Sequence, residues 1–331
     1  VDKTVESMSQ TEKLGQMVMI GIQGTKVDDD SLYMLNQYHM GGVILFDRNM
    51  ESPEQVKQLT SDLQAQSNEK VPLFIGIDEE GGDVVRMAEK LTPPPSQKEI
   101  GATGDIEQAK TWAIKTAKSL KDMGINVNFA PVADVGSNDK RSYSYNTNTV
   151  IDFVRAATEG YQQENIIYSL KHFPGIGKGR VDSHVDSSSI DVAKEVLMAE
   201  DILPFKTIID GNEPNDYFIL VSHLKYPALD EEYPASLSSK IMTDLLRNEL
   251  GYKGIIITDD MEMGAVANHN DFRSIGVKAV KAGADIVLVC HEYKHQQEVY
   301  LGLLDAVNSG EISQERIDES VKRIIKVKLL H

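Results

Sequence analysis

A lysine, two histidines and an aspartate lie close together in a glycine-rich stretch near the middle of the chain. Lys171 and His172 directly follow the apolar run 166–170, and Asp182 and His184 come after three alternating glycines. Ionisable groups of this kind are rarely buried in a core without partners. An imidazole, with an unperturbed pKa of about 6.5, is suited to proton transfer near neutral pH. The stretch therefore predicts binding or catalysis.

Polar residues also follow four other apolar runs, at the point where each expected strand ends. These residues are Asp78 with Glu79, Asp134, Ser222 with His223, and Asp259 with Asp260. Strand ends that merely meet water would explain one or two such cases but not five strands. The pattern predicts a polar pocket at one end of a sheet.

The apolar runs indicate how these residues are positioned. We expect eight strands, at 17–22, 42–46, 73–77, 126–132, 166–170, 217–221, 254–258 and 285–290. The runs are continuously apolar rather than alternating, which is typical of parallel strands covered on both faces. Amphipathic stretches between them predict helices, with clear ends at 105–123, 238–250 and 313–330.

Eight alternating strands and helices predict a single (β/α)8 barrel of the TIM type that spans residues 1–331. In such barrels the chemistry takes place at the C-terminal ends of the strands. The alternative is a doubly wound open sheet, which normally has fewer strands and a glycine-rich dinucleotide-binding turn after the first. The segment 21–24, Gly-Ile-Gln-Gly, is too short for that turn.

Composition excludes several classes of partner. The 331 residues are 41% hydrophobic and carry a formal net charge of −17, which argues against nucleic acid and anionic membrane surfaces. No apolar stretch approaches the length of a membrane span. Cys290 is the only cysteine, so no intrachain disulfide forms. The start at Val1 instead of Met and the lack of paired thiols favour export slightly over a cytoplasmic location.

Three motifs resemble family 3 glycoside hydrolases, in particular their bacterial β-N-acetylglucosaminidase (β-hexosaminidase) branch. The motifs are Ile77-Asp-Glu-Glu-Gly-Gly-Asp-Val-Val-Arg86, Lys171-His-Phe-Pro-Gly175 continuing to Asp182-Ser-His184, and Ile257-Thr-Asp-Asp-Met261. The long second motif is the specific one, and the resemblance extends over nearly the whole chain.

The resemblance implies a role for each site residue and a small carbohydrate substrate, with no metal or cofactor. Asp259 matches the nucleophile, and His184, oriented by Asp182, matches the acid/base. The sugar-binding positions are Asp78, Arg86, Arg141, Lys171 and His172. Two departures occur, at Asp83, where the family usually has Arg, and at Ile176, where His is common.

The expected activity is exo-acting, retaining removal of N-acetylglucosamine from peptidoglycan fragments or chitin oligosaccharides through a covalent intermediate on Asp259. Substrate-assisted cleavage by the acetamido group and phosphorolysis are alternatives at the same bond. A metal-dependent barrel hydrolase is a further alternative, although such enzymes place His-x-His at the end of the first strand. A non-catalytic sugar-binding protein would leave the pairing of Asp182 and His184 with Asp259 unexplained.

Overall fold

The computed structural model describes residues 1–331 except 69, 89–90, 137–139 and 180–187. Eight parallel strands form one nearly closed barrel in the order β7-β6-β5-β4-β3-β2-β1-β8. They are β1 (Val18–Gly21), β2 (Gly42–Leu45), β3 (Phe74–Ile77), β4 (Val127–Asn128), β5 (Ile167–Phe173), β6 (Tyr217–Val221), β7 (Ile255–Thr258) and β8 (Val287–Val289).

The barrel closes between β7 and β8. Thr258 donates its backbone N–H to the carbonyl of Ile286 at 3.1 Å, and Asp285 donates to the carbonyl of Ile256 at 2.8 Å. An open sheet would leave these two strands apart. The predicted (β/α)8 barrel is therefore confirmed, with a strand at each of the eight predicted positions.

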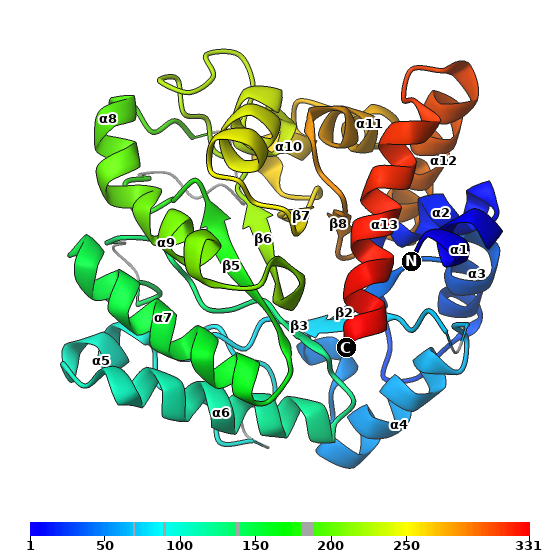
Figure 1. Ribbon diagram of the computed structural model, residues 1–331. Helices are drawn as coiled ribbons and strands as arrows, with labels where there is room; N and C mark the ends of the chain where they lie inside the picture. The colour runs from blue at the N-terminus through cyan, green and yellow to red at the C-terminus, as the bar shows by residue number, and fades with distance from the viewer. Residues whose placement is uncertain (69, 89–90, 137–139, 180–187) are drawn as a thin grey trace.

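Helices surround the strands on the outside (Figure 1). The α-helices are α1 (Asp2–Ser7), α2 (Gln10–Gln16), α3 (Asp29–Tyr38), α4 (Pro53–Gln64), α5 (Gln97–Ala102), α6 (Ile106–Asp122), α7 (Thr147–Gln163), α8 (Lys194–Val196), α9 (Leu203–Gly211), α10 (Gly264–Ala267), α11 (Phe272–Ala282), α12 (Tyr293–Ser309) and α13 (Gln314–Leu330). Tighter or wider helical turns are η1 (Asp47–Asn49), η2 (Leu197–Asp201), η3 (Pro214–Asp216), η4 (Ala235–Leu237) and η5 (Lys240–Glu249). Within the described part of the chain, none of the helices combines the length and apolar character needed to cross a membrane.

The three helices with clear sequence signals are present. Asp105 caps α6 by accepting the N–H of Glu107, and Gly124 follows that helix with a positive φ of 79°. Ser313 caps α13 by accepting the N–H of Arg316. The segment predicted as a helix at 238–250 is η5, whose turns are wider than those of an α-helix.

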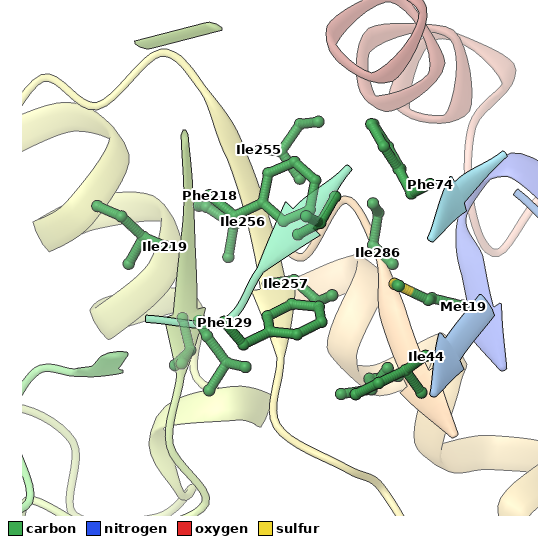
Figure 2. Packing of buried hydrophobic residues seen from close by; sticks show 14 of the residues in the cluster. Met19, Ile44, Phe74, Phe129, Phe218, Ile219, Ile255, Ile256, Ile257 and Ile286 are labelled. Atoms are coloured by element: carbon green, nitrogen blue, oxygen red, sulfur yellow. The ribbon is translucent and has the colours of Figure 1, made fainter. Parts of the chain in front are cut away.

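Large side chains fill the interior of the barrel. An aromatic cluster of Phe74, Phe129 and Phe218 lies at its centre (Figure 2). The rings of Phe74 and Phe218 pack edge to face, with their centres 5.1 Å apart. Gly76 leaves the space for this packing, since a Cβ there would lie 2.7 Å from the Phe129 ring and 3.0 Å from Met19. The interior is thus a packed core that supports the pocket at one end.

The last helix, α13, lies next to α1 and α2 (Figure 1), and its C-terminal part reaches the N-terminal end of β2. Lys328 of α13 is buried, and its ammonium donates to the Gln16 side chain and the Gly41 carbonyl, both at 2.7 Å. It also lies 4.7 Å from the centre of the Phe74 ring. Burial lowers the pKa of Lys328 to about 7.

Candidate active site

A cavity of about 300 Å³ opens at the C-terminal ends of the strands. Every described residue of the predicted site lines it: Asp78, Arg86, Arg141, Lys171, His172 and Asp259. Asp182 and His184, the predicted acid/base pair, lie outside the described residues. The predicted polar pocket therefore exists, and loops that are far apart in the sequence supply its walls.

An irregularity in β5 brings Lys171 and His172 to the same cavity. Lys171 pairs with Leu220 of β6, and Phe173 pairs with the next residue, Val221. His172 is thus an extra residue in β5, as in a β-bulge, which re-aims side chains at the ends of strands. In a regular strand, consecutive side chains would point to opposite faces.

A buried carboxylate, Glu80, holds two of the cations. Lys171 Nζ lies 2.5 Å from Glu80 Oε2, and Arg141 donates two hydrogen bonds to Glu80, at 2.9 and 2.7 Å. Burial by itself raises the pKa of Glu80, but Lys171 and Arg141 outweigh it and lower the pKa to about 2. Glu80 is therefore ionised and fixes the position of both cations.

Within the described structure, Asp78 is the second carboxylate that pairs with the Lys171 ammonium. Its Oδ1 accepts from Lys171 Nζ at 2.9 Å, and its Oδ2 lies 3.5 Å from Arg86 Nη2. Burial lowers the pKa of Lys171, but the carboxylates of Asp78 and Glu80 outweigh it and raise the pKa, so the ammonium stays charged. Arg86 also packs over the Phe46 ring, 5.1 Å from its centre.

The ring of His172 is held by Asp134. Its Nδ1 donates to Asp134 Oδ2 at 2.8 Å, while Asp134 Oδ1 accepts the backbone N–H groups of His172 and Ile176 at 3.2 and 3.0 Å. On the other side of the ring, Nε2 lies 3.3 Å from Arg141 Nη2. Ile176, one of the two departures from the family pattern, thus supports Asp134 through its backbone.

Two adjacent aspartates after β7 have different surroundings. Asp259 lines the cavity and accepts the backbone N–H of Asp260 at 2.9 Å. Burial alone would raise the pKa of Asp259, but His223, His172, that N–H group and Lys171 together lower it. Asp259 is therefore ionised at neutral pH.

Asp260 instead supports the backbone. Its Oδ1 accepts the N–H groups of Glu262 and Cys290, both at 3.1 Å. Burial and the nearby charge of Glu262 raise the pKa of Asp260 to about 7. The two ring nitrogens of His223 lie 2.7 Å from the Asp260 carbonyl oxygen and 2.6 Å from the Ser236 hydroxyl, so His223 positions this turn.

Sequence reasoning did not assign Glu80, and it placed Asp134 and His223 only as supporting or pocket residues. A signal for Glu80 existed, because Asp78-Glu79-Glu80 puts three acids after one strand while Lys171 stands at the end of another. Among the described residues, no group of three or more His, Cys, Asp or Glu side chains is arranged to hold a metal ion.

The fold and the site define a (β/α)8-barrel protein with a charged pocket at the C-terminal ends of its strands. Residues 9–327 match the model of the glycosyl hydrolase family 3 N-terminal domain. The chain belongs to glycosyl hydrolase family 3.

Individual relatives agree with this assignment. The chain is 35% identical over 326 residues to β-hexosaminidase A of Pseudoalteromonas piscicida and 31% identical over 318 residues to a β-hexosaminidase of Nitrosomonas eutropha. Among solved structures, a glycoside hydrolase family 3 β-N-acetylglucosaminidase from Paenibacillus sp. str. FPU-7 superimposes with a TM-score of 0.94 at 37% identity.

The share of each protein that is covered differs. The matches take in 89% of this chain and 54% of the Pseudoalteromonas protein, and 92% of this chain and 90% of the Nitrosomonas protein. The superposition covers 97% of this chain and 62% of the Paenibacillus chain. The chain thus spans about half of one relative and nearly all of another.

Proposed function

We propose that residues 1–331 form the catalytic barrel of an exo-acting, retaining β-N-acetylglucosaminidase. The enzyme removes terminal N-acetylglucosamine from peptidoglycan fragments or chitin oligosaccharides through a covalent glycosyl–Asp259 intermediate. The names of the relatives, β-hexosaminidase and β-N-acetylglucosaminidase, support the activity. One observation carries the proposal, namely that the ionised carboxylate of Asp259 faces the same cavity as the fixed cations.

The nucleophile must be negatively charged and must not be tied up by the protein. Within the described structure, Asp259 accepts one hydrogen bond, from the N–H of Asp260. Its pKa lies below the ordinary value, so it is ready to attack an anomeric carbon at neutral pH. Asp260 fits this role less well, because two backbone N–H groups occupy its Oδ1 and its pKa is raised to about 7.

The sugar is held by charged groups that are already fixed. Lys171 and Arg141 donate, Asp78 accepts, and each is kept in place by a buried neighbour. Fixed donors and acceptors of this kind hold hydroxyl groups at defined angles with little loss of side-chain entropy. His172 and Arg86 complete this sugar-binding set.

We propose His184 as the acid/base and Asp182 as the residue that orients it, from the sequence alone. Retention requires an acid over the leaving oxygen, roughly 5 Å from the nucleophile. His184 protonates the leaving group and then removes a proton from the water that hydrolyses the Asp259 ester. Asp182 favours the imidazolium form, as the aspartate of a catalytic triad does.

Trapping with a slow fluorinated N-acetylglucosaminide tests the proposal. We expect mass spectrometry of the digested protein to place one sugar on Asp259 and none on Asp260. Asp259→Ala should lower turnover by at least roughly a thousandfold. Asp260→Asn is the matched control and should still form the adduct. Unchanged turnover in Asp259→Ala would refute the assignment.

Further assays distinguish the alternatives. Strong inhibition by a thiazoline mimic with no trapped adduct would indicate substrate-assisted cleavage. Formation of a sugar 1-phosphate in phosphate buffer would indicate phosphorolysis. Loss of activity with a chelator would indicate a metal-dependent hydrolase, and binding of the sugar without turnover would indicate a sugar-binding protein.

A further inference from the structure

The cavity carries more negative than positive side chains, and one of the negative groups lies at its mouth. Asp83 lines the cavity and is exposed, whereas Glu80 is almost completely buried. The Asp83 carboxylate makes no hydrogen bond or ion pair with another described residue. An exo-acting enzyme binds the terminal sugar at the closed end, so the leaving group lies at the mouth. Asp83 is therefore placed to meet the leaving group.

The cations of the cavity are already engaged by carboxylates. Lys171 contacts Asp78 and Glu80, and Arg141 binds Glu80 through two hydrogen bonds. Arg86 lies within 3.5 Å of Asp78 and 3.9 Å of Asp47. Among the lining residues that the structure describes, no cation thus remains without a carboxylate to receive a negatively charged substrate.

We propose that the site selects a leaving group without a carboxylate, and that Asp83 is the specificity-determining residue. A neutral N-acetylglucosamine unit, as in chitin oligosaccharides, has hydroxyl and amide N–H groups that donate to Asp83. A muramic acid unit, as in peptidoglycan, carries a carboxylate that Asp83 repels. The net charge of −17 adds to this repulsion at low salt. This inference rests on the proposed function and narrows its substrate class.

Competition between two disaccharides tests the inference. We would measure kcat/KM for N,N′-diacetylchitobiose and for N-acetylglucosaminyl-β-1,4-N-acetylmuramic acid, at about 0.02 M and about 0.3 M salt. Wild type should prefer the neutral disaccharide, and high salt should reduce this preference. Asp83→Asn should lower the preference by roughly 3- to 10-fold at low salt, as expected for two like charges near a protein surface.

A matched control removes the same charge elsewhere. Asp122 is exposed at the end of α6, at the opposite end of the barrel, so Asp122→Asn should leave the preference unchanged. Equal effects of both variants, or equal kcat/KM for both disaccharides in wild type at low salt, would overturn the inference. Thermal melting establishes that both variants are folded.

Binding separates this inference from the proposed function. In the Asp259→Ala background, calorimetry gives the Kd of each disaccharide with and without the additional substitution Asp83→Asn. A binding preference that depends on Asp83, with no turnover of either disaccharide by wild type, would refute the proposed function and support the charge selection. Turnover of both disaccharides, with a binding preference that does not depend on Asp83, would support the proposed function and refute the charge selection.

Discussion

Replacing Glu80 is the most demanding test of the ion pairs that hold Lys171 and Arg141. Its side chain is only 2% exposed and bridges Lys171 and Arg141. Gln has the same shape but no charge. In Glu80→Gln, one acceptor oxygen becomes an NH₂ donor that faces two other donors. We expect the variant to be less stable and to bind the sugar more weakly.

The size of the effect follows from the pKa of Glu80. Burial would raise that pKa, but Lys171 and Arg141 lower it to about 2, from an ordinary value of 4.5. A difference of that size corresponds to about 3 kcal/mol of stability at neutral pH. Mutations that remove one partner of a buried ion pair cost about 3–5 kcal/mol, which is the same scale. We therefore expect Tm to fall by roughly 5–10 °C.

The dependence on pH identifies the cause. Because folding lowers the pKa of Glu80, its contribution is fully present above about pH 4.5 and is lost as the pH falls toward 2. Urea unfolding of wild type and Glu80→Gln should thus show a difference in the free energy of unfolding that is constant near neutral pH. The difference should shrink in acid, until the protein unfolds too readily to measure.

Glu79 is the neighbouring control. Burial raises its pKa to about 7, so ionisation of Glu79 reduces stability as the pH rises from about 4.5 through 7. In Glu79→Gln the side-chain oxygen still accepts the N–H of Arg86, at 2.6 Å in wild type. We expect this variant to equal or exceed wild type in stability above pH 7. Equal losses in both variants, or a loss in Glu80→Gln that does not change with pH, would refute the reasoning.

Three further outcomes follow from the same structure. In Asp134→Asn the amide oxygen keeps the backbone N–H groups, so the NH₂ group faces Nδ1 of His172. The ring proton then moves to Nε2, where the N–H group points at the Arg141 guanidinium. We expect KM in steady-state assays to rise roughly tenfold. Gly76→Ala places a methyl group in the aromatic cluster, 2.7 Å from the Phe129 ring, and should lower the free energy of unfolding in urea by about 1–3 kcal/mol. Burial lowers the pKa of Lys328 to about 7. The free energy of unfolding of wild type should therefore rise by roughly 2–4 kcal/mol relative to that of Lys328→Met between pH 7 and pH 10.

The barrel could be predicted from the sequence because its strands are buried on both faces. Each strand then appears as a continuous apolar run, and β7 with Ile255–Thr258 is the clearest case. Strand ends were less exact. The expected run 126–132 contains only two residues of regular strand, Val127–Asn128, although the chain beyond them stays beside β5, where Val132 forms an isolated parallel bridge with Lys171. The run that was expected to end at 170 continues to Phe173.

The members of the site could be predicted, but their partners could not. Ionisable residues at strand ends converge in any parallel barrel, which is why Lys171 and Asp259 share a cavity. The contacts of Glu80 join residues 61 and 91 positions apart, and no local pattern encodes such pairs. The extra residue in β5 depends on the register with β6, which is also set by the fold.

The distribution of charge also bears on the choice of acid. The cavity lining already holds more carboxylates than cations, and Asp259 keeps its low pKa only because histidines, a lysine and an N–H group surround it. A second catalytic carboxylate close to Asp259 would raise the pKa of one member of the pair. An imidazole supplies the proton without adding a negative charge. The proposed role of His184 thus suits a pocket in which the nucleophile must stay ionised among other acids.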